Sequence, residues 1–345
     1  MAFGGYVVRK KFGLYSIVLC FVFAVTIFTA CGSNKKNAGS VANVRLNEVA
    51  RSVFYAPMYV AINKDMFKQQ GINIELTTGQ GADKTMQQVL SGSCDIGFCG
   101  PEQTIYIYNQ KRKDFPVLFA QLTATDGSFL VGRNEEKNFK WKSVKGKTII
   151  GGRPGGVPEM ALEYVLKKNN IQPGKDVNLI TNLAYTATAG AFKAGTGNYV
   201  ALFEPTASML EKDKDGYIQA SVGESAGVLP YTCYFATKSY ISKNPELIQK
   251  FTNAIYKGQI WVQRHSDEEV AEAIKSFFPG TDENVLKSVI KNYRSIKAYA
   301  GTPVIKEQDL NRLMDVIQSY KSSLIPERPP FDKIVNNSFS EKAIK

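Results

Sequence analysis

Residues that could catalyse a reaction are scarce in this sequence, whereas residues that could hold a small molecule recur in loops. The single histidine among the 345 residues, His265, lies in a charged segment, so a Ser–His–Asp triad or a histidine-based metal site lacks partners. The segment 146–148 (GKT) lacks the upstream glycine of a phosphate-binding loop, and 79–81 (GQG) lacks the third glycine of a dinucleotide motif. Scattered carboxylates leave a glycosidase pair open but disfavoured. The sequence therefore predicts no metal or cofactor site and favours binding over catalysis.

Small, polar and aromatic residues gather in six loops that each follow a predicted strand. These loops are 51–57, 77–81, 97–103, 123–127, 151–156 and 203–206. Ligands of open α/β sheets bind beyond the carboxyl ends of the strands, and glycines at helix N-termini expose backbone N–H groups there. The alternative is that the glycines only make tight turns and the aromatic residues cap the cores. Because the loops come from two halves of the chain, we expect them to clamp a small molecule.

The elements that must position these loops alternate along the chain. Strands are predicted at 44–49, 72–76, 95–99, 117–121 and 128–131, with helices at 59–67, 83–90 and 101–109 between them. After a charged stretch the pattern restarts, with strands at 147–150, 177–180 and 199–203 and helices at 158–168 and 188–193. Beyond a strand at 231–236 the chain is nearly all helical, at 245–262, 267–277, 283–293 and 306–324. The order predicts two α/β lobes, each with a mostly parallel sheet, and a helical tail.

Composition fits this two-lobed globular interpretation. Hydrophobic residues make up 44% and charged residues 21% of the chain, which excludes disordered and fibrous classes. The formal net charge of +12 is spread along the sequence, and three of the positive residues precede the apolar run near the N-terminus. This distribution favours a solvated surface near a membrane over a nucleic-acid-binding stripe.

The N-terminus has the pattern of an export signal. Arg9, Lys10 and Lys11 precede an apolar run, 12–28, which ends in small residues before Cys31. The segment 28–31 (FTAC) is similar to a lipobox, with phenylalanine where leucine is more usual. A transmembrane anchor is the alternative, although the run is short for crossing a bilayer. We expect a signal peptide (1–30), a lipidated Cys31 with a flexible tether (31–43), and a location on the outer face of the bacterial cytoplasmic membrane.

The remaining cysteines do not suggest a disulfide framework. Cys20 lies in the leader and Cys31 is the predicted anchor, which leaves Cys94, Cys99 and Cys233 among apolar neighbours. We expect these three to be buried free thiols of unassigned role.

The order of several short motifs resembles the substrate-binding lipoproteins of ABC importers, in the nitrate/sulfonate/taurine and thiamine-precursor (NMT1-like) group. The motifs are 55–61 (YAPMYVA), 66–67 (MF), 71–76 (GINIEL), 79–81 (GQG), 90–97 (LSGSCDIG), 146–147 (GK), 203–205 (FEP) and 244–246 (NPE). This resemblance implies a type II periplasmic-binding-protein fold, with two Rossmann-like lobes, a double-crossover hinge and a helical C-terminal tail. It also implies a monomer with a small-molecule ligand, ABC permease and ATPase partners, and no nucleic acid. The expected lobes are 44–128 with 235–345, and 129–234.

Carried over by position, the resemblance gives the residues expected to contact the ligand. They are Phe54, Tyr55, Gly79, Gln80, Gly81, Phe98, Glu102, Asp126, Gly127, Ser128, Arg153, Gly155, Gly156, Tyr185 and Glu204. An oxyanion such as a sulfonate would use backbone N–H groups with Thr77, Thr78, Ser128 or Arg153. A nitrogen heterocycle would stack on aromatic rings, Tyr231 among them, and donate to carboxylates such as Glu48. The numbers of acidic and aromatic residues favour the heterocycle or another organic solute. Arg153 could instead pair with Glu204 across the cleft as a latch.

Two other functions fit the same fold. An enzyme of the pyrimidine-synthesising branch would need a cluster of histidine and cysteine near the cleft, and a lone His265 argues against it. A ligand-sensing lipoprotein without transport cannot be separated from an importer component by sequence.

Overall fold

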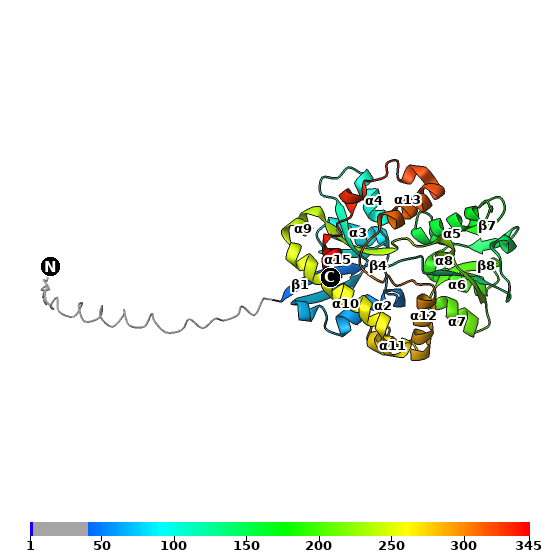
Figure 1. Cartoon of the computed structure of the whole chain (residues 1–345), viewed down its shortest axis with the longest axis horizontal. Coiled ribbons are helices and arrows are strands. Elements are labelled where there is room, and N and C mark those ends of the chain that lie inside the picture. The colour runs from blue at the N-terminus through cyan, green and yellow to red at the C-terminus, as the bar shows by residue number, and fades with distance from the viewer. Residues whose placement is uncertain (3–40) are drawn as a thin grey trace. The chain divides into compact units, whose positions relative to one another are not determined.

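Two five-stranded sheets form the framework of the computed structural model, which describes residues 1–2 and 41–345 (Figure 1). In the first sheet the order is β2 (Ile72–Thr78), β1 (Ala42–Glu48), β3 (Ile96–Cys99), β10 (Thr232–Thr237) and β4 (Pro116–Thr123). In the second it is β7 (Asn178–Ile180), β6 (Thr148–Ile150), β8 (Tyr199–Phe203), β5 (Ser128–Gly132) and β9 (Tyr217–Ser221). The predicted leader, Cys31 and most of the tether lie outside the described residues.

Both sheets are mostly parallel, as the sequence predicts, but each contains one reversed strand. Strand β10 runs antiparallel to its neighbours β3 and β4, and β5 runs antiparallel to β8 and β9. The chain enters β5 directly from β4 and enters β10 after leaving β9. Parallel neighbouring strands are joined by a crossover connection that brings the chain back to the same end of the sheet. The chain instead enters β5 and β10 from the other lobe, and these are the two strands that run antiparallel to their neighbours.

The two passages between the lobes lie side by side and form the double crossover. The Tyr231 N–H donates to the Thr123 carbonyl (3.1 Å), and the Leu229 N–H donates to the Ala124 carbonyl (3.0 Å). A Cβ on Gly223 would lie 1.9 Å from the Asp126 carbonyl oxygen, so only glycine permits this approach. Ser128, the last residue expected in the first lobe, begins β5 of the second sheet, and β10 of the first sheet begins at Thr232 rather than at residue 235.

Helices cover the sheets. The first lobe carries α2 (Ala56–Asn63), α3 (Ala82–Leu90), α4 (Glu102–Asn109), α9 (Lys238–Lys243), α10 (Pro245–Arg264), α11 (Asp267–Ile274), α14 (Phe331–Ile334) and α15 (Ser338–Ala343). The second carries α5 (Val157–Lys168), α6 (Tyr185–Lys193), α7 (Thr206–Lys212) and α8 (Val222–Ala226). Among the helices of residues 41–345, none combines the length and apolar character that crossing a membrane requires.

The helix expected at 59–67 is shorter and starts earlier, as α2. It ends at Asn63 because Asp65 adopts a left-handed backbone (φ 57°), which a helix cannot include. Gly71 has φ 72° and closes the following 3₁₀ turn, as the sequence predicts.

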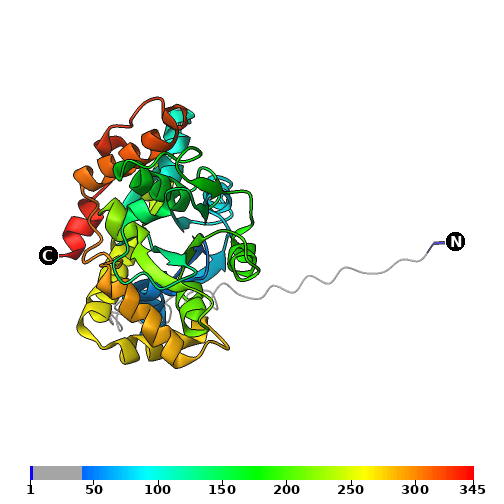
Figure 2. The same ribbon diagram turned by 90° about the vertical axis from the view of Figure 1, so that its right-hand side faces the viewer.

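Two helices of the C-terminal tail contact the second lobe. Helix α12 (Glu283–Ser295) packs against α7, and α13 (Glu307–Lys321) packs against α5 and α4 (Figure 1). The orange tail helices line one side of the molecule in the turned view (Figure 2). The Lys167 ammonium donates to the Ser319 carbonyl at 2.6 Å, which ties α5 to the tail. The tail therefore links the lobes in addition to the two crossings.

Candidate ligand-binding site

The loops predicted to hold a ligand lie where the two lobes meet. The segments after Glu48, Thr78 and Cys99 leave the carboxyl ends of β1, β2 and β3, and those after Ile150 and Phe203 leave the carboxyl ends of β6 and β8. Contacts across the lobes come from these loops and from the helices that follow them. The Tyr106 hydroxyl of α4, for example, lies 3.9 Å from Met160 Sδ of α5. The strand ends of the two sheets therefore face each other.

Aromatic rings from both lobes pack together at this boundary. The centroid of the Phe54 ring, which is 1% exposed, lies 5.6 Å from that of Tyr231 and 6.2 Å from that of Phe203 in the second lobe. Tyr185 meets Phe203 edge-on at 6.0 Å, and Tyr55 lies beside Phe54 at 5.7 Å. We call Phe54, Tyr55, Tyr185, Phe203 and Tyr231 the aromatic cluster.

Gly127 permits this packing. A Cβ at that position would lie 2.9 Å from the Phe54 ring and 3.1 Å from the Phe203 ring. Phe98 lies behind Tyr55, at 4.7 Å, and stacks on Tyr234 within the first lobe. Gly127 thus lies in contact with the aromatic cluster, whereas Phe98 packs behind the cluster in the core of the first lobe.

Two carboxylates lie beside the aromatic cluster. Glu102, in the first turn of α4, is 3% exposed, and its Oε2 accepts no hydrogen bond from the described residues. Asp126, in the first crossing, is 0% exposed; its Oδ1 accepts hydrogen bonds from the backbone N–H (2.8 Å) and the hydroxyl of Ser128, but its Oδ2 has no partner there. Burial raises the pKa of Glu102 to about 7, and burial also raises the pKa of Asp126. A buried, unpartnered carboxylate oxygen is costly unless something else binds it.

Sequence analysis missed a third carboxylate, Glu159 in α5. Its Oε2 accepts the Gly152 N–H at 2.6 Å, its Oε1 has no partner among the described residues, and burial raises its pKa to about 7. A Cβ on Gly151 would lie 2.2 Å from Glu159 Oε2, and one on Gly100 would lie 2.0 Å from Glu102 Oε2. The two lobes thus place a glutamate in the same way. A proline directly before each glutamate, at 101 and 158, is the signal that could have found the pair.

Glu204 and Glu48 have their partners within the protein. Glu204 accepts hydrogen bonds from the Ser208 N–H (2.9 Å), the Ser208 hydroxyl (2.7 Å) and the Asn292 amide of α12 (2.6 Å). Glu48 accepts from the Tyr59 hydroxyl (2.6 Å), from Arg51 (2.6 Å) and from Thr78 (2.9 Å). Both are occupied by structural contacts.

The alternative in which Arg153 pairs with Glu204 as a latch is not what the structure shows. Arg153 Nη2 lies 3.5 Å from Asp83 Oδ1 of α3, and the arginine side chain is 64% exposed. Glu204 instead bonds with Ser208 and Asn292, which lie beside it and leave it 3% exposed. Arg153 does connect the lobes, but at the rim of the site and through a different acid.

Four backbone N–H groups of the glycine loops donate hydrogen bonds within the protein. In the 79–81 loop, the Gly79 and Gly81 N–H groups donate to the carbonyls of Glu48 (2.8 Å) and Val49 (3.0 Å), while Gln80 has φ 57°. In the 151–156 loop, Gly151 donates to the Ile180 carbonyl (3.0 Å) and Gly156 to that of Arg153 (3.1 Å). Gly155, at φ 75°, makes the turn between them. These amides shape the loops and are already bonded.

Tyr293 of α12 is a further member that the sequence did not reveal. Its ring centroid lies 4.8 Å from that of Phe54, and its hydroxyl accepts the Glu204 N–H at 3.3 Å. On the sequence it belongs to the apolar stripe of an amphipathic helix, which gives no sign of a long-range contact.

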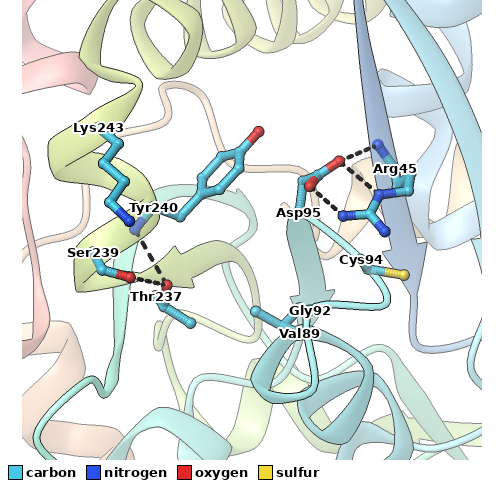
Figure 3. A pocket seen from close by; sticks show the side chains of 9 residues that line it. All are labelled: Arg45, Val89, Gly92, Cys94, Asp95, Thr237, Ser239, Tyr240 and Lys243. Carbon is cyan, nitrogen blue, oxygen red and sulfur yellow. Dashed lines mark hydrogen bonds and ion pairs between the residues drawn. The ribbon is translucent and has the colours of Figure 1, made fainter.

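Two cavities lie away from the lobe boundary. One is in the first lobe, lined by Arg45, Asp95, Tyr240 and their neighbours, where Arg45 bonds Asp95 at 2.7 and 3.1 Å (Figure 3). The other lies beside α5 and β7, with Lys167 and Asn178 in its wall.

The three cysteines Cys94, Cys99 and Cys233 are buried free thiols, as predicted. Within residues 41–345, no group of acidic, histidine and cysteine side chains is placed to hold a metal ion.

Two α/β lobes, a double crossover and facing strand ends define a protein of the periplasmic-binding-protein class. The sequence model of the NMT1-like family matches residues 43–276, and the chain belongs to that family.

Known relatives agree with this class. The chain is 42% identical to "Putative binding protein YtlA" of Bacillus subtilis (strain 168) over 93% of its own length and 94% of that protein. Its fold is similar to that of the periplasmic aliphatic sulphonate binding protein SsuA from Escherichia coli, with a TM-score of 0.69, 14% identity, and coverage of 89% of this chain and all of that one. It is 24% identical to the 4-amino-5-hydroxymethyl-2-methylpyrimidine phosphate synthase of Aspergillus parasiticus, over 73% of this chain and 69% of that enzyme. Binding proteins among the relatives support a solute-binding function.

Proposed function

We propose that this protein is an extracytoplasmic receptor that captures one small organic molecule between its lobes and delivers it to an ABC importer. The observation that carries the proposal is the aromatic cluster. Rings from the first lobe, the second crossing and the second lobe meet there beside buried carboxylates, each with one oxygen that has no partner among the described residues. YtlA, described as a binding protein, and SsuA, described as a sulphonate-binding protein, support the same role.

Within this role, the ligand is a nitrogen heterocycle rather than an aliphatic sulfonate. Flat rings stack on aromatic side chains, and ring or exocyclic N–H groups donate to carboxylates. A sulfonate needs donors, but the glycine-loop amides Gly79, Gly81, Gly151 and Gly156 are bonded within the protein. Arg153 is paired with Asp83 at the rim. An acid beside an anion would weaken binding.

The proposal extends to the cell surface. A lipid on Cys31 and the tether that follows would hold a monomeric receptor at the outer face of the cytoplasmic membrane, beside its permease and ATPase. The lobes would then open and close about the double crossover.

An enzyme is the second candidate, because the Aspergillus parasiticus synthase is a relative. In this chain His265 stacks on Trp261 at the end of α10, with ring centroids 3.8 Å apart, and its Nδ1 lies 2.8 Å from the Trp261 carbonyl oxygen. This placement lies outside the aromatic cluster and favours the receptor.

A thermal-melting screen tests the receptor proposal. Residues 34–345 would be melted with pyrimidines, sulfonates, nitrate, flavins and amino acids. A ligand present at 100 times its Kd stabilises the folded protein by about 2.7 kcal/mol, so one class should raise the Tm by several degrees. Flat melting curves across all classes would contradict the proposal.

A pair of tyrosine variants locates the binding site in the same screen. Tyr185→Ala removes an exposed ring of the aromatic cluster, and we expect it to abolish the shift. Tyr240→Ala is the matched control, because it lies in the separate cavity of Figure 3. Loss of the shift in Tyr240→Ala alone would move the binding site to that cavity.

A further inference from the structure

Glu102 and Asp126 each have one buried carboxylate oxygen without a hydrogen-bond partner among the described residues, as Glu159 also has. Glu48 and Glu204 are buried to the same degree, yet each accepts three hydrogen bonds. By contrast, Glu102 Oε2 and Asp126 Oδ2 accept none from the described residues. Glu48 and Glu204 show that this chain can satisfy a buried carboxylate completely, so something outside the described chain is expected to bind the free oxygens of Glu102 and Asp126.

The charges of both carboxylates raise the pKa of the same tyrosine, Tyr231. The pKa of Tyr231 is raised well above its usual value, first by burial, then by the negative charge of Asp126 and by a side-chain hydrogen bond with Asp126, and last by the charge of Glu102. Asp126 also raises the pKa of Tyr185 in the second lobe. The two acids therefore lie around the aromatic cluster, and they concentrate negative potential at its rings.

Basic residues do not neutralise this potential. Arg153 is the cation whose charge lowers the pKa of Glu102, but it is 64% exposed and lies 3.5 Å from Asp83. Arg51 is bonded to Glu48 at 2.6 Å. Burial raises the pKa of Asp126, and the hydrogen bonds that oppose this shift come from Ser128 and Tyr231, which are neutral. The interior of the site thus carries acids and ring faces without a matching positive charge.

We propose that the ligand is an organic cation, a flat nitrogen base that carries a delocalised positive charge and donates N–H groups to Glu102 and Asp126. This inference rests on the proposed receptor function and specifies the charge of its ligand. Aromatic faces attract cations, and a carboxylate bonds an amidinium more strongly than a neutral amide. The positive charge would supply a partner for Glu102 Oε2 and Asp126 Oδ2, which accept no hydrogen bond from the described residues. An anion such as a sulfonate would be repelled.

Three probes of similar size and shape test the charge. Full-length protein in non-ionic detergent would be titrated with benzamidine, which is cationic, benzamide, which is neutral, and benzenesulfonate, which is anionic. We expect benzamidine to bind at least tenfold more tightly than benzamide, and benzenesulfonate not to bind. Equal affinities, a preference for benzenesulfonate, or no binding of any probe would overturn the inference.

Two charge-removing variants connect the preference to these residues. Glu102→Gln and Asp126→Asn should each reduce the benzamidine preference at least tenfold.

The same variants also test the burial argument. Glu102→Gln should raise the Tm of the ligand-free protein, because it removes a buried carboxylate with one oxygen that lacks a partner. Glu48→Gln should lower the Tm, because its carboxylate is fully bonded. Asp315→Asn, which removes an exposed charge paired with Arg328, should change neither property. An unchanged probe preference in Glu102→Gln and Asp126→Asn would overturn the inference.

The experiments separate the two proposals. If the ligand screen finds a sulfonate or a neutral solute that needs Tyr185, the receptor stands and the cation inference fails. If the screen and all three probes show no binding, both fail.

Discussion

At the scale of single residues, each lobe has a buried glutamate packed against a glycine. Glu102 and Glu159 each lie in the first turn of a helix. The carboxylate of Glu102 leaves no room for a Cβ on Gly100, and that of Glu159 leaves none on Gly151. Burial raises both pKa values to about 7. The carboxyl groups are therefore stable in the fold mainly when protonated, so the stability of the ligand-free protein depends on pH.

Glu159→Gln tests this dependence. Glu159 has a folded pKa above its unfolded value of about 4.5, so its contribution to stability is present below pH 4.5 and is lost as pH rises to about 7. Relative to Glu159→Gln, the wild-type free energy of unfolding should fall by up to about 3 kcal/mol across that range and then level off. Urea unfolding between pH 4 and 8 measures it.

The control for that titration is Asp315→Asn, whose curve should run parallel to the wild type. The expectation for Glu159 fails if the wild-type and Glu159→Gln curves also run parallel.

At the scale of elements, the close packing of α10 on α2 depends on one glycine. A Cβ at Gly258 would lie 2.3 Å from the Pro57 carbonyl oxygen and 3.0 Å from the Ala61 Cβ. The apolar face of α10, including Phe251, Ile255 and Val262, is buried beside this contact. The two helices can approach because position 258 has no side chain.

Two glycine-to-alanine substitutions should act in opposite directions. Gly258→Ala should destabilise the protein by about 1–3 kcal/mol, because α10 and α2 must separate. Gly190→Ala, in α6, should stabilise it by about 0.5–1 kcal/mol, because a Cβ there meets nothing within 4 Å and alanine favours helix. Calorimetric Tm values of the two variants measure both effects. A rise in Tm for Gly258→Ala would contradict the packing argument.

Elements and their loops could be predicted from sequence because local patterns specify them. The strand expected at 199–203 is β8 as observed, and alternating strands and helices placed the loops at the correct strand ends. The reversed direction of β5 and β10 could not be predicted, because it depends on which sheet the chain returns to. That choice is made by packing over long sequence distances and leaves no local pattern.

The candidate site shows the same limit. Loop residues such as Phe54 and Asp126 could be found, because they follow strands. Glu159, Asn292 and Tyr293 could not, since each looks like an ordinary helix residue until the lobes are brought together. The partner of Arg153 could not be found for the same reason: opposite charges in a sequence do not reveal which pair meets.

At the scale of the whole molecule, the proposed location depends on Cys31. Cys31→Ser removes the thiol that would carry the lipid, so we expect the protein to leave the membrane fraction and become soluble. Cys20→Ser, within the leader, is the matched control and should leave the protein membrane-bound. Fractionation and immunoblotting of cells measure both variants. If Cys31→Ser stays in the membrane and keeps its leader, the leader is a membrane anchor.

The position of β10 between β3 and β4 has a consequence for how the polypeptide matures. All strands of the second sheet come from one continuous stretch, Ser128 to Ser221, whereas the first sheet lacks its β10 strand until residue 237 has been made. A chain that emerges from its N-terminus can therefore complete the inserted lobe while the enclosing lobe is still unfinished. The enclosing lobe needs β10 and the helices that follow it, and truncation before Thr232 would leave β3 and β4 without the strand that joins them.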